Sequence, residues 1–341
     1  MTRALKSSFF IYSLILFGLS YLSLAVSGSF LLNLLKKLGF VQFIRKEGPQ
    51  SHQKKQFTPT AGGLIFIICI PLVFIINYIF SLISKTPLDY KVLGLEALVI
   101  LFSGLIGFFD DYLKKVKKQN EGLKPKQKLI AQIILSLIVA FALQRTETQF
   151  FNLSINLNFI LFCILVFFVL AGTMNASNLT DGLDGLAASV MGCSFLGLAV
   201  LIYLTTFNIS SIFWAMALSG ICFGFLHINA YPAKVFMGDT GSFLLGGALA
   251  SLALINKLEW YLLLIAIIPL WETVSVLLQV LSSKISKKFF NKDWRPFKMS
   301  PFHHHLELCG LNEKQIVAYL AVVQAVFCLI AVLLLNKFFQ K

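Results

Sequence analysis

The segment KVLGLEALVILFSGLIGFFDDYLKKVKK, residues 91–118, decides the fold. Residues 92–109 contain a single ionisable side chain, Glu96, and they are followed by two aspartates and then by four lysines. About 20 mostly apolar residues are enough for a helix to cross the hydrocarbon of a membrane. The segment therefore predicts a transmembrane helix over 92–113 whose polar end carries acids and bases together.

Similar apolar stretches lie on both sides of this segment. They fall at 9–33, 62–84, 128–144, 157–174, 184–205, 211–228, 241–255, 260–281 and 316–336. The 240–283 stretch is too long for one span, so we divide it at the polar turn 256–259. The sequence thus predicts an all-α polytopic membrane protein of about ten transmembrane helices. We find no repeat and no soluble region, so residues 1–341 form a single integral-membrane domain.

The composition supports a lipid environment. The chain is 57% hydrophobic and 13% charged, whereas soluble domains keep about a quarter of their residues charged. The net charge of +14 does not indicate nucleic acid binding, because no basic region stands apart from the apolar stretches. The six cysteines show no metal-binding spacing, which argues against a zinc site or a disulfide framework.

The distribution of basic residues sets the orientation. The loops 34–61, 114–127 with Lys128, 175–183, 229–240 and 282–315 contain 21 of the 29 lysines and arginines. Positive charges favour the cytoplasmic side, so these loops are predicted to be cytoplasmic and both termini to lie outside. We expect a multi-pass protein of the bacterial inner membrane.

The acidic residues and histidines gather at the same predicted face. Acids are costly at membrane depth, so their positions at span ends are informative. The residues are Asp110, Asp111, Asp181, Asp184, Asp239, His303, His304 and His305. We therefore predict a cytoplasmic-face active site for a phosphate-bearing substrate. Glu96 and Glu272 fall inside spans, and whether their roles are structural or functional stays open.

Each motif also has a simpler interpretation. Asp110-Asp111 fits a solvated helix end, and Lys117 and Lys118 fit a topology signal. The Gly238–Ser242 stretch fits an ordinary helix N-terminus, although its glycines also let backbone N–H groups approach a phosphate. The convergence of all the motifs on one face favours the functional interpretation.

In these motifs the chain resembles the phospho-N-acetylmuramoyl-pentapeptide-transferase family, within the polyprenyl-phosphate N-acetylhexosamine-1-phosphate transferase superfamily. The resemblance extends from about Arg45 to the last span. It is carried by RKEGPQSH (45–52), TPT (58–60), GFFDDY (107–112), NASNLTDGLDG (175–185), PAKVFMGD (232–239) and SPFHHHLE (300–307). Ala61, Leu306 and Cys309 depart from the family pattern without removing a charged or polar position.

The resemblance implies transfer of phospho-MurNAc-pentapeptide from UDP-MurNAc-pentapeptide to undecaprenyl phosphate, giving lipid I and UMP in peptidoglycan synthesis. It implies a Mg²⁺ cofactor, with Asp239 as the metal ligand. The catalytic residues would be Asp110, Asp111, Asp239, His304 and His305. The substrate-binding residues would be Lys55, Thr60, Asn175, Asn178, Asp181, Asp184, Asn229, Phe236 and His303.

Several alternatives stay open. A one-step attack by the lipid phosphate is favoured over an aspartyl-phosphate route, because most phosphomonoesters are already dianions at pH 7. A sister transferase using UDP-GlcNAc is one rival function, and a ten-helix transporter or flippase is another. The oligomeric state is not determined by the sequence, and a homodimer remains one alternative. The basic 282–315 loop, including Arg295, is expected to face the donor's peptide arm.

Overall fold

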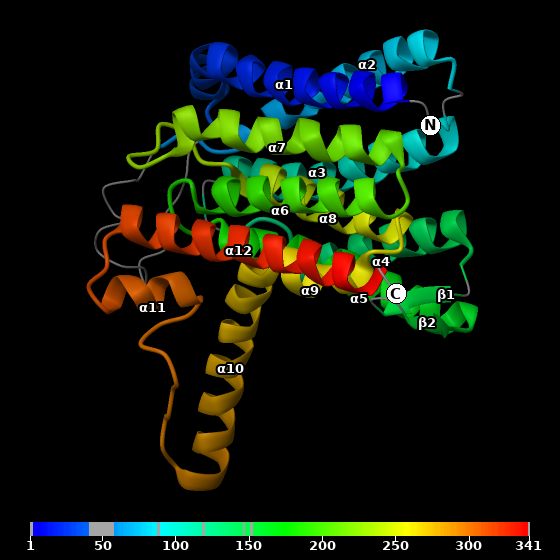
Figure 1. The fold of residues 1–341 in the computed structure, drawn as a ribbon. Coiled ribbons are helices and arrows are strands. Elements are labelled where there is room, and N and C mark those ends of the chain that lie inside the picture. The colour runs from blue at the N-terminus through cyan, green and yellow to red at the C-terminus, as the bar shows by residue number, and fades with distance from the viewer. Residues whose placement is uncertain are drawn as a thin grey trace.

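The computed structural model describes residues 3–40, 58–86, 89–117, 119, 121–145, 147–150 and 153–339, and it shows a helical bundle (Figure 1). Among these residues, nine helices are long and apolar enough to cross a membrane, and a bent pair makes a tenth candidate. The predicted all-α polytopic fold is confirmed. The spanning helices are α1 (Arg3–Leu38), α2 (Cys69–Ser84) with the 3-10 helix η2 (Gly62–Ile68), α3 (Tyr90–Lys117), α4 (Pro125–Leu143), α5 (Phe159–Thr180), α6 (Leu186–Leu204), α7 (Ile209–Asn229), α8 (Gly238–Ile255) and α12 (Glu313–Phe339).

Three helices form the centre of the bundle. About four-fifths of the most apolar window of α6, α7 and α8 is buried, whereas the corresponding fraction is 28% in α1, α4 and α12. The outer helices expose large apolar side chains such as Phe30, Phe168 and Val322. A helix that is apolar all round is expected to face lipid or to lie in a core. The bundle therefore has a protein interior around α8 and an apolar rim.

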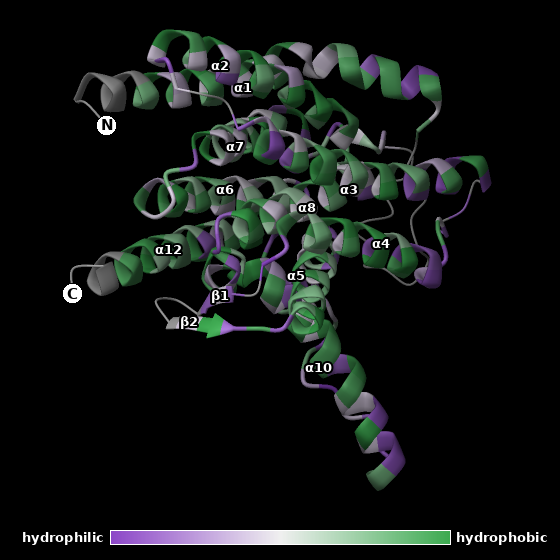
Figure 2. Ribbon diagram, turned by 90° about the vertical axis from the view of Figure 1, so that its right-hand side faces the viewer, coloured by the Kyte–Doolittle hydropathy of each residue, from purple (hydrophilic) through white to green (hydrophobic). Residues whose placement is uncertain are grey.

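Both ends of the described chain lie at the same end of the bundle (Figures 1 and 2), as an even number of crossings requires. Hydrophilic residues gather at the opposite end and along the far part of α10 (Ile267–Phe290) (Figure 2). The candidate functional residues lie at that opposite end, where α3 ends and α8 begins.

The ninth predicted span differs in shape from the others. A 3-10 turn, η3 (Glu259–Tyr261), and α9 (Leu262–Ile265) enter the bundle, and α10 then departs at an angle of 83°. Pro269 has no N–H to donate to the Ile265 carbonyl, four residues earlier. Gln324 of α12 replaces that donor: its Nε2 lies 2.8 Å from the Ile265 oxygen, and its Oε1 accepts the Ile268 N–H at 3.1 Å. The break is thus satisfied within the protein, and α10 projects away from the bundle (Figure 1).

A short hairpin closes the end of the bundle that carries the termini. It consists of β1 (Glu147–Phe150) and β2 (Leu153–Asn156), which pair in antiparallel register. Arg145 bonds to Glu259 and to the Leu254 carbonyl, each at 2.6 Å, and Thr148 donates to the same carboxylate. These contacts fix the turn after α8, where the sequence predicted a break.

Candidate active site

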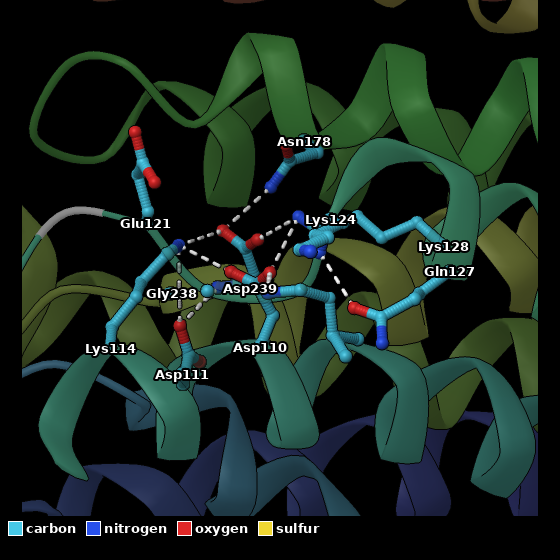
Figure 3. Close-up of polar contacts among 12 residues, drawn as sticks. Asp110, Asp111, Lys114, Glu121, Lys124, Gln127, Lys128, Asn178, Gly238 and Asp239 are labelled. Carbon is cyan, nitrogen blue, oxygen red and sulfur yellow. Dashed lines mark hydrogen bonds and ion pairs between the residues drawn. The ribbon is translucent and has the colours of Figure 1, made fainter. Parts of the chain in front are cut away.

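Three carboxylates from two helices meet at the polar end of the bundle (Figure 3). Asp110 and Asp111 lie in the last turns of α3, and Asp239 lies in the first turn of α8, with ligand oxygens within 4.8 Å of one another. The close approach depends on Gly107, because an added Cβ there would lie 2.0 Å from the Asp239 carbonyl oxygen. The structure therefore brings together the three aspartates that the sequence singled out.

Asp111 holds the start of α8. Its carboxylate accepts the backbone N–H groups of Asp239 at 3.2 Å and Thr240 at 2.9 Å, and the Thr240 hydroxyl at 2.6 Å. The first N–H groups of a helix have no partner within the helix, and a carboxylate there also interacts favourably with the helix dipole. The hydrogen bonds of Asp111 thus go to the start of α8, which positions Asp239.

Two lysines neutralise part of the cluster (Figure 3). Lys114 Nζ lies 2.7 Å from Asp110 and 3.1 Å from Asp239, and Lys128 Nζ lies 3.0 Å and 2.8 Å from the same two side chains. With all groups ionised, three carboxylates and two ammonium groups leave one negative charge. Such a site attracts a further cation, and it also offers two ammonium groups to a phosphate.

No motif in the sequence assigns a specific role to these two lysines. Lys114 was part of a basic run, although its position four residues after Asp110 places both on one helix face. In the sequence, Lys128 contributes only to the positive charge of a loop predicted to be cytoplasmic. It comes from α4, and only the packing of α4 beside α3 and α8 brings it to Asp110 and Asp239.

Asp239 is the most accessible of the three acids. Its side chain is 14% exposed, whereas Asp110 and Asp111 are 1% and 2% exposed. Asp110 also accepts the Leu123 backbone N–H at 2.7 Å, and Asp239 accepts from Asn178 Nδ2 at 3.0 Å. Mg²⁺ favours oxygen ligands and takes only one or two protein carboxylates while keeping several waters. The donor set of this cluster therefore fits a divalent magnesium ion, with Asp239 the most open ligand.

The turn between α5 and α6 lies beside the carboxylates. Asp181 lies close to the Gly238 backbone N–H, and burial together with the nearby Asp239 and Asp111 raises the pKa of Asp181 well above its usual value. Thr60 approaches from another side: a Cβ on Gly238 would lie 3.0 Å from its hydroxyl oxygen. Asn175 bonds to the Ala171 carbonyl at 2.7 Å and to Gln132 at 3.3 Å.

A second group of predicted residues surrounds the loop after α7. Asp184 accepts the Ala233 N–H at 2.9 Å, and Asn229 joins the Gly185 N–H to the Val235 carbonyl. Phe236 is half-buried in this loop. Asp184, Asn229 and Phe236 are therefore neighbours, as a shared binding role requires.

The three histidines belong to α11 (Phe302–Leu308) and have different surroundings. His303 is buried, His304 Nδ1 lies 2.7 Å from Glu307, and His305 Nδ1 accepts the Lys298 backbone N–H at 3.1 Å. Arg295 lies past the end of α10 and pairs with Asp293 at 3.0 Å. Lys55 lies outside the described residues.

Known proteins resemble this chain over most of its length. Residues 93–257 match the model of glycosyl transferase family 4. A phospho-N-acetylmuramoyl-pentapeptide-transferase of Clostridium perfringens is 45% identical over 327 residues, which cover 92% of this chain and 95% of the relative.

The chain belongs to the phospho-N-acetylmuramoyl-pentapeptide-transferase family.

Two further relatives bear the same name. The protein of Oceanobacillus iheyensis is 42% identical, covering 87% of this chain and 90% of its own length. That of a Geobacillus species is 39% identical, covering 92% and 95%. The predicted family is thus confirmed. All the candidate residues except Lys55 lie in the described part of this phospho-N-acetylmuramoyl-pentapeptide-transferase.

Proposed function

We propose that this protein transfers phospho-MurNAc-pentapeptide from UDP-MurNAc-pentapeptide to undecaprenyl phosphate, at the cytoplasmic face of the bacterial inner membrane. The observation that carries the proposal is the meeting of Asp110, Asp111 and Asp239 with Lys114 and Lys128 at one end of a membrane bundle. Two anionic substrates must approach each other in this reaction, and the cluster supplies both cations and metal-binding oxygens. The names of the relatives support the same activity.

The transfer forms one phosphorus–oxygen bond and breaks another. An oxygen of the lipid phosphate attacks the phosphorus attached to the sugar, and the bond from that phosphorus to UMP breaks. A phosphomonoester has a second pKa of about 6, so the nucleophile is already a dianion at neutral pH and no general base is required. Asp110 is almost fully buried and bonded to Lys114, Lys128 and Leu123, which favours a positioning role over attack on phosphorus.

We propose that Asp239, with Asp110 beside it, would hold Mg²⁺. When bound, the ion neutralises phosphate charge and orients the phosphoryl group. Lys114 and Lys128 would then interact with phosphate oxygens as well as with the carboxylates. Asp184, Asn229 and Phe236 would hold the uracil, with Phe236 stacking on the base. Lys55, Thr60, Asn175, Asn178 and Asp181 would complete the nucleotide side.

Donor choice must come from groups beyond the diphosphate, because uridine and diphosphate are common to UDP-sugars. We propose that His304 and His305, with Lys298 beside them, contact the sugar or the carboxylate-bearing peptide arm. UDP-GlcNAc lacks that arm and would not make these contacts. A site built on polar contacts rejects a substrate that lacks them by about 10⁴-fold.

The experiment is a comparison of UMP release from the two donors by purified protein with undecaprenyl phosphate. Strong turnover of UDP-MurNAc-pentapeptide and almost none of UDP-GlcNAc is expected, and Mg²⁺ should restore activity that a chelator abolishes. His304→Ala and His305→Ala should lower turnover sharply. Comparable kcat/KM for the two donors would refute the donor assignment while leaving a phosphoglycosyl transferase in place.

A further inference from the structure

Glu272 is a fully buried carboxylate in α10, and its side-chain contacts among the described residues go to His303. Glu272 Oε2 lies 3.1 Å from His303 Nδ1 and accepts the His303 backbone N–H at 3.3 Å. The two side chains are 0% and 1% exposed. A buried charge without a partner is strongly unfavourable, so the fold depends on the two groups remaining together.

The other edge of the His303 ring rests on the turn between α5 and α6. An added Cβ on Gly182 would lie 2.2 Å from His303 Nε2 and 2.5 Å from Cε1, so no side chain fits between them. The carboxylate of the preceding residue, Asp181, lies close to the backbone N–H of Gly238, which adjoins Asp239. A continuous set of contacts thus leads from α10 through the imidazole to the carboxylate cluster.

The carboxylate also restricts the orientation of the ring. The Nδ1 edge of the imidazole faces Glu272 and the Nε2 edge faces Gly182. Rotation of the ring would move Nδ1 away from the Glu272 carboxylate, so a single orientation is favoured.

Further contacts make α10 the support for the whole segment that carries the histidines. The Gln279 side chain bonds to both the N–H and the carbonyl of Phe297, at 3.1 Å and 2.9 Å. Trp271 packs edge-on against Phe297 and Phe302. The position of α11 therefore follows the position of α10.

We propose that Glu272 is a positioning residue, which holds the His303 imidazole in one orientation against the α5–α6 turn and so fixes that turn beside Gly238 and Asp239. Glu272 itself touches no substrate and acts through His303. This inference rests on the proposed transferase function, because its effect is measured as the rate of transfer.

The test is a double-mutant cycle on UMP release, with Glu272→Gln, His303→Ala and the double variant. Glu272→Gln should lower kcat by on the order of 10- to 100-fold, by analogy with the range found when a partner that orients a metal-ligating histidine is removed. The KM for the donor should stay within about twofold of wild type, because no donor contact is lost. In the His303→Ala background the same change should have almost no further effect, because the group through which it acts is gone.

Glu96→Gln is the matched control. Glu96 is also a fully buried glutamate inside a span, but it bonds to Ser211 and lies on α3. It should lower kcat by less than about threefold, with a factor that multiplies the His303→Ala defect. Thermal unfolding midpoints of all variants separate a loss of folded protein from a loss of rate.

Where His303→Ala leaves no measurable turnover, ¹⁵N spectra of histidine-labelled protein supply the second readout. Glu272→Gln should move the ring signals that His303→Ala removes, and Glu96→Gln should not. The inference is overturned if Glu272→Gln multiplies the His303→Ala defect in full, or if it leaves both kcat and the ring signals unchanged. Absence of UMP release from the wild type would instead refute the proposed function.

Discussion

The three aspartates of the cluster differ in what surrounds them, although their ligand oxygens lie within 4.8 Å of one another. Asp111 is bonded to the backbone at the start of α8, and Asp110 is bonded to two lysines and a backbone N–H. Asp239 contacts the same two lysines and Asn178, but it is the most exposed of the three. At the residue scale, the cluster therefore separates into two acids that build the site and one that is open to a ligand.

Asp239→Asn is expected to lose nearly all activity while the protein still inserts and folds. The substitution keeps the shape of the side chain and removes the charge that would bind the metal. The measurement is UMP release in Mg²⁺ together with the thermal unfolding midpoint. Turnover above about a tenth of wild type, roughly 1.4 kcal/mol of activation free energy, would mean that Asp239 is not the essential ligand.

Lys128→Met is expected to lower kcat/KM by on the order of 100-fold, because it removes an ammonium group fixed between Asp110 and Asp239. Lys126→Met is the control: Lys126 lies on the same helix, is exposed, and should be neutral. Both variants are compared by steady-state UMP release. Equal effects of the two substitutions would show that only net charge matters.

The sequence could predict the aspartates because each stands at the end of an apolar stretch, and parity places all of them on one face. It could not assign Lys128, since its partners lie on α3 and α8 and no spacing along the chain connects them. The pairing of Glu272 with His303 could not be predicted either, because the two residues lie on different helices. Residues whose role depends on a neighbouring helix become visible only when the helices are packed.

At the scale of elements, the break before α10 involves two residues that come from different helices. Pro269 leaves the Ile265 carbonyl without its helical donor, and Gln324 supplies one from α12. The sequence predicted a span over 260–281 from its apolar composition alone. Composition does not determine the direction in which a helix axis runs. The angle of 83° depends on this contact between helices that are far apart in sequence.

Gln324→Leu is expected to lower the free energy of unfolding by about 1–3 kcal/mol, because the Ile265 carbonyl and the Ile268 N–H would be left unpaired in an apolar interior. The measurement is the thermal unfolding midpoint in detergent. Val322→Ala, a lipid-exposed change on the same helix, serves as the control. Equal midpoints for wild type and Gln324→Leu would show that the amide does not stabilise the break.

At the scale of the whole molecule, all site assignments depend on which end of the bundle faces the cytoplasm. Single cysteines at Gln119 and Asn291, introduced into a variant without other cysteines, should react with an impermeant thiol reagent only from the cytoplasm. A cysteine at Thr86, at the opposite end of α2, should react only from outside. The opposite accessibility at any of the three would contradict the orientation predicted from the basic loops.

The projecting helix α10 also makes the protein wider on one side of the bundle. Its 24 residues span about 36 Å, comparable to the thickness of a bilayer. Figure 1 shows α10 leaving the side of the bundle at a steep angle to the other helices, so it occupies the space beside that part of the bundle. Two copies packed side by side would then have to meet on another side of the bundle, or place their α10 helices next to each other.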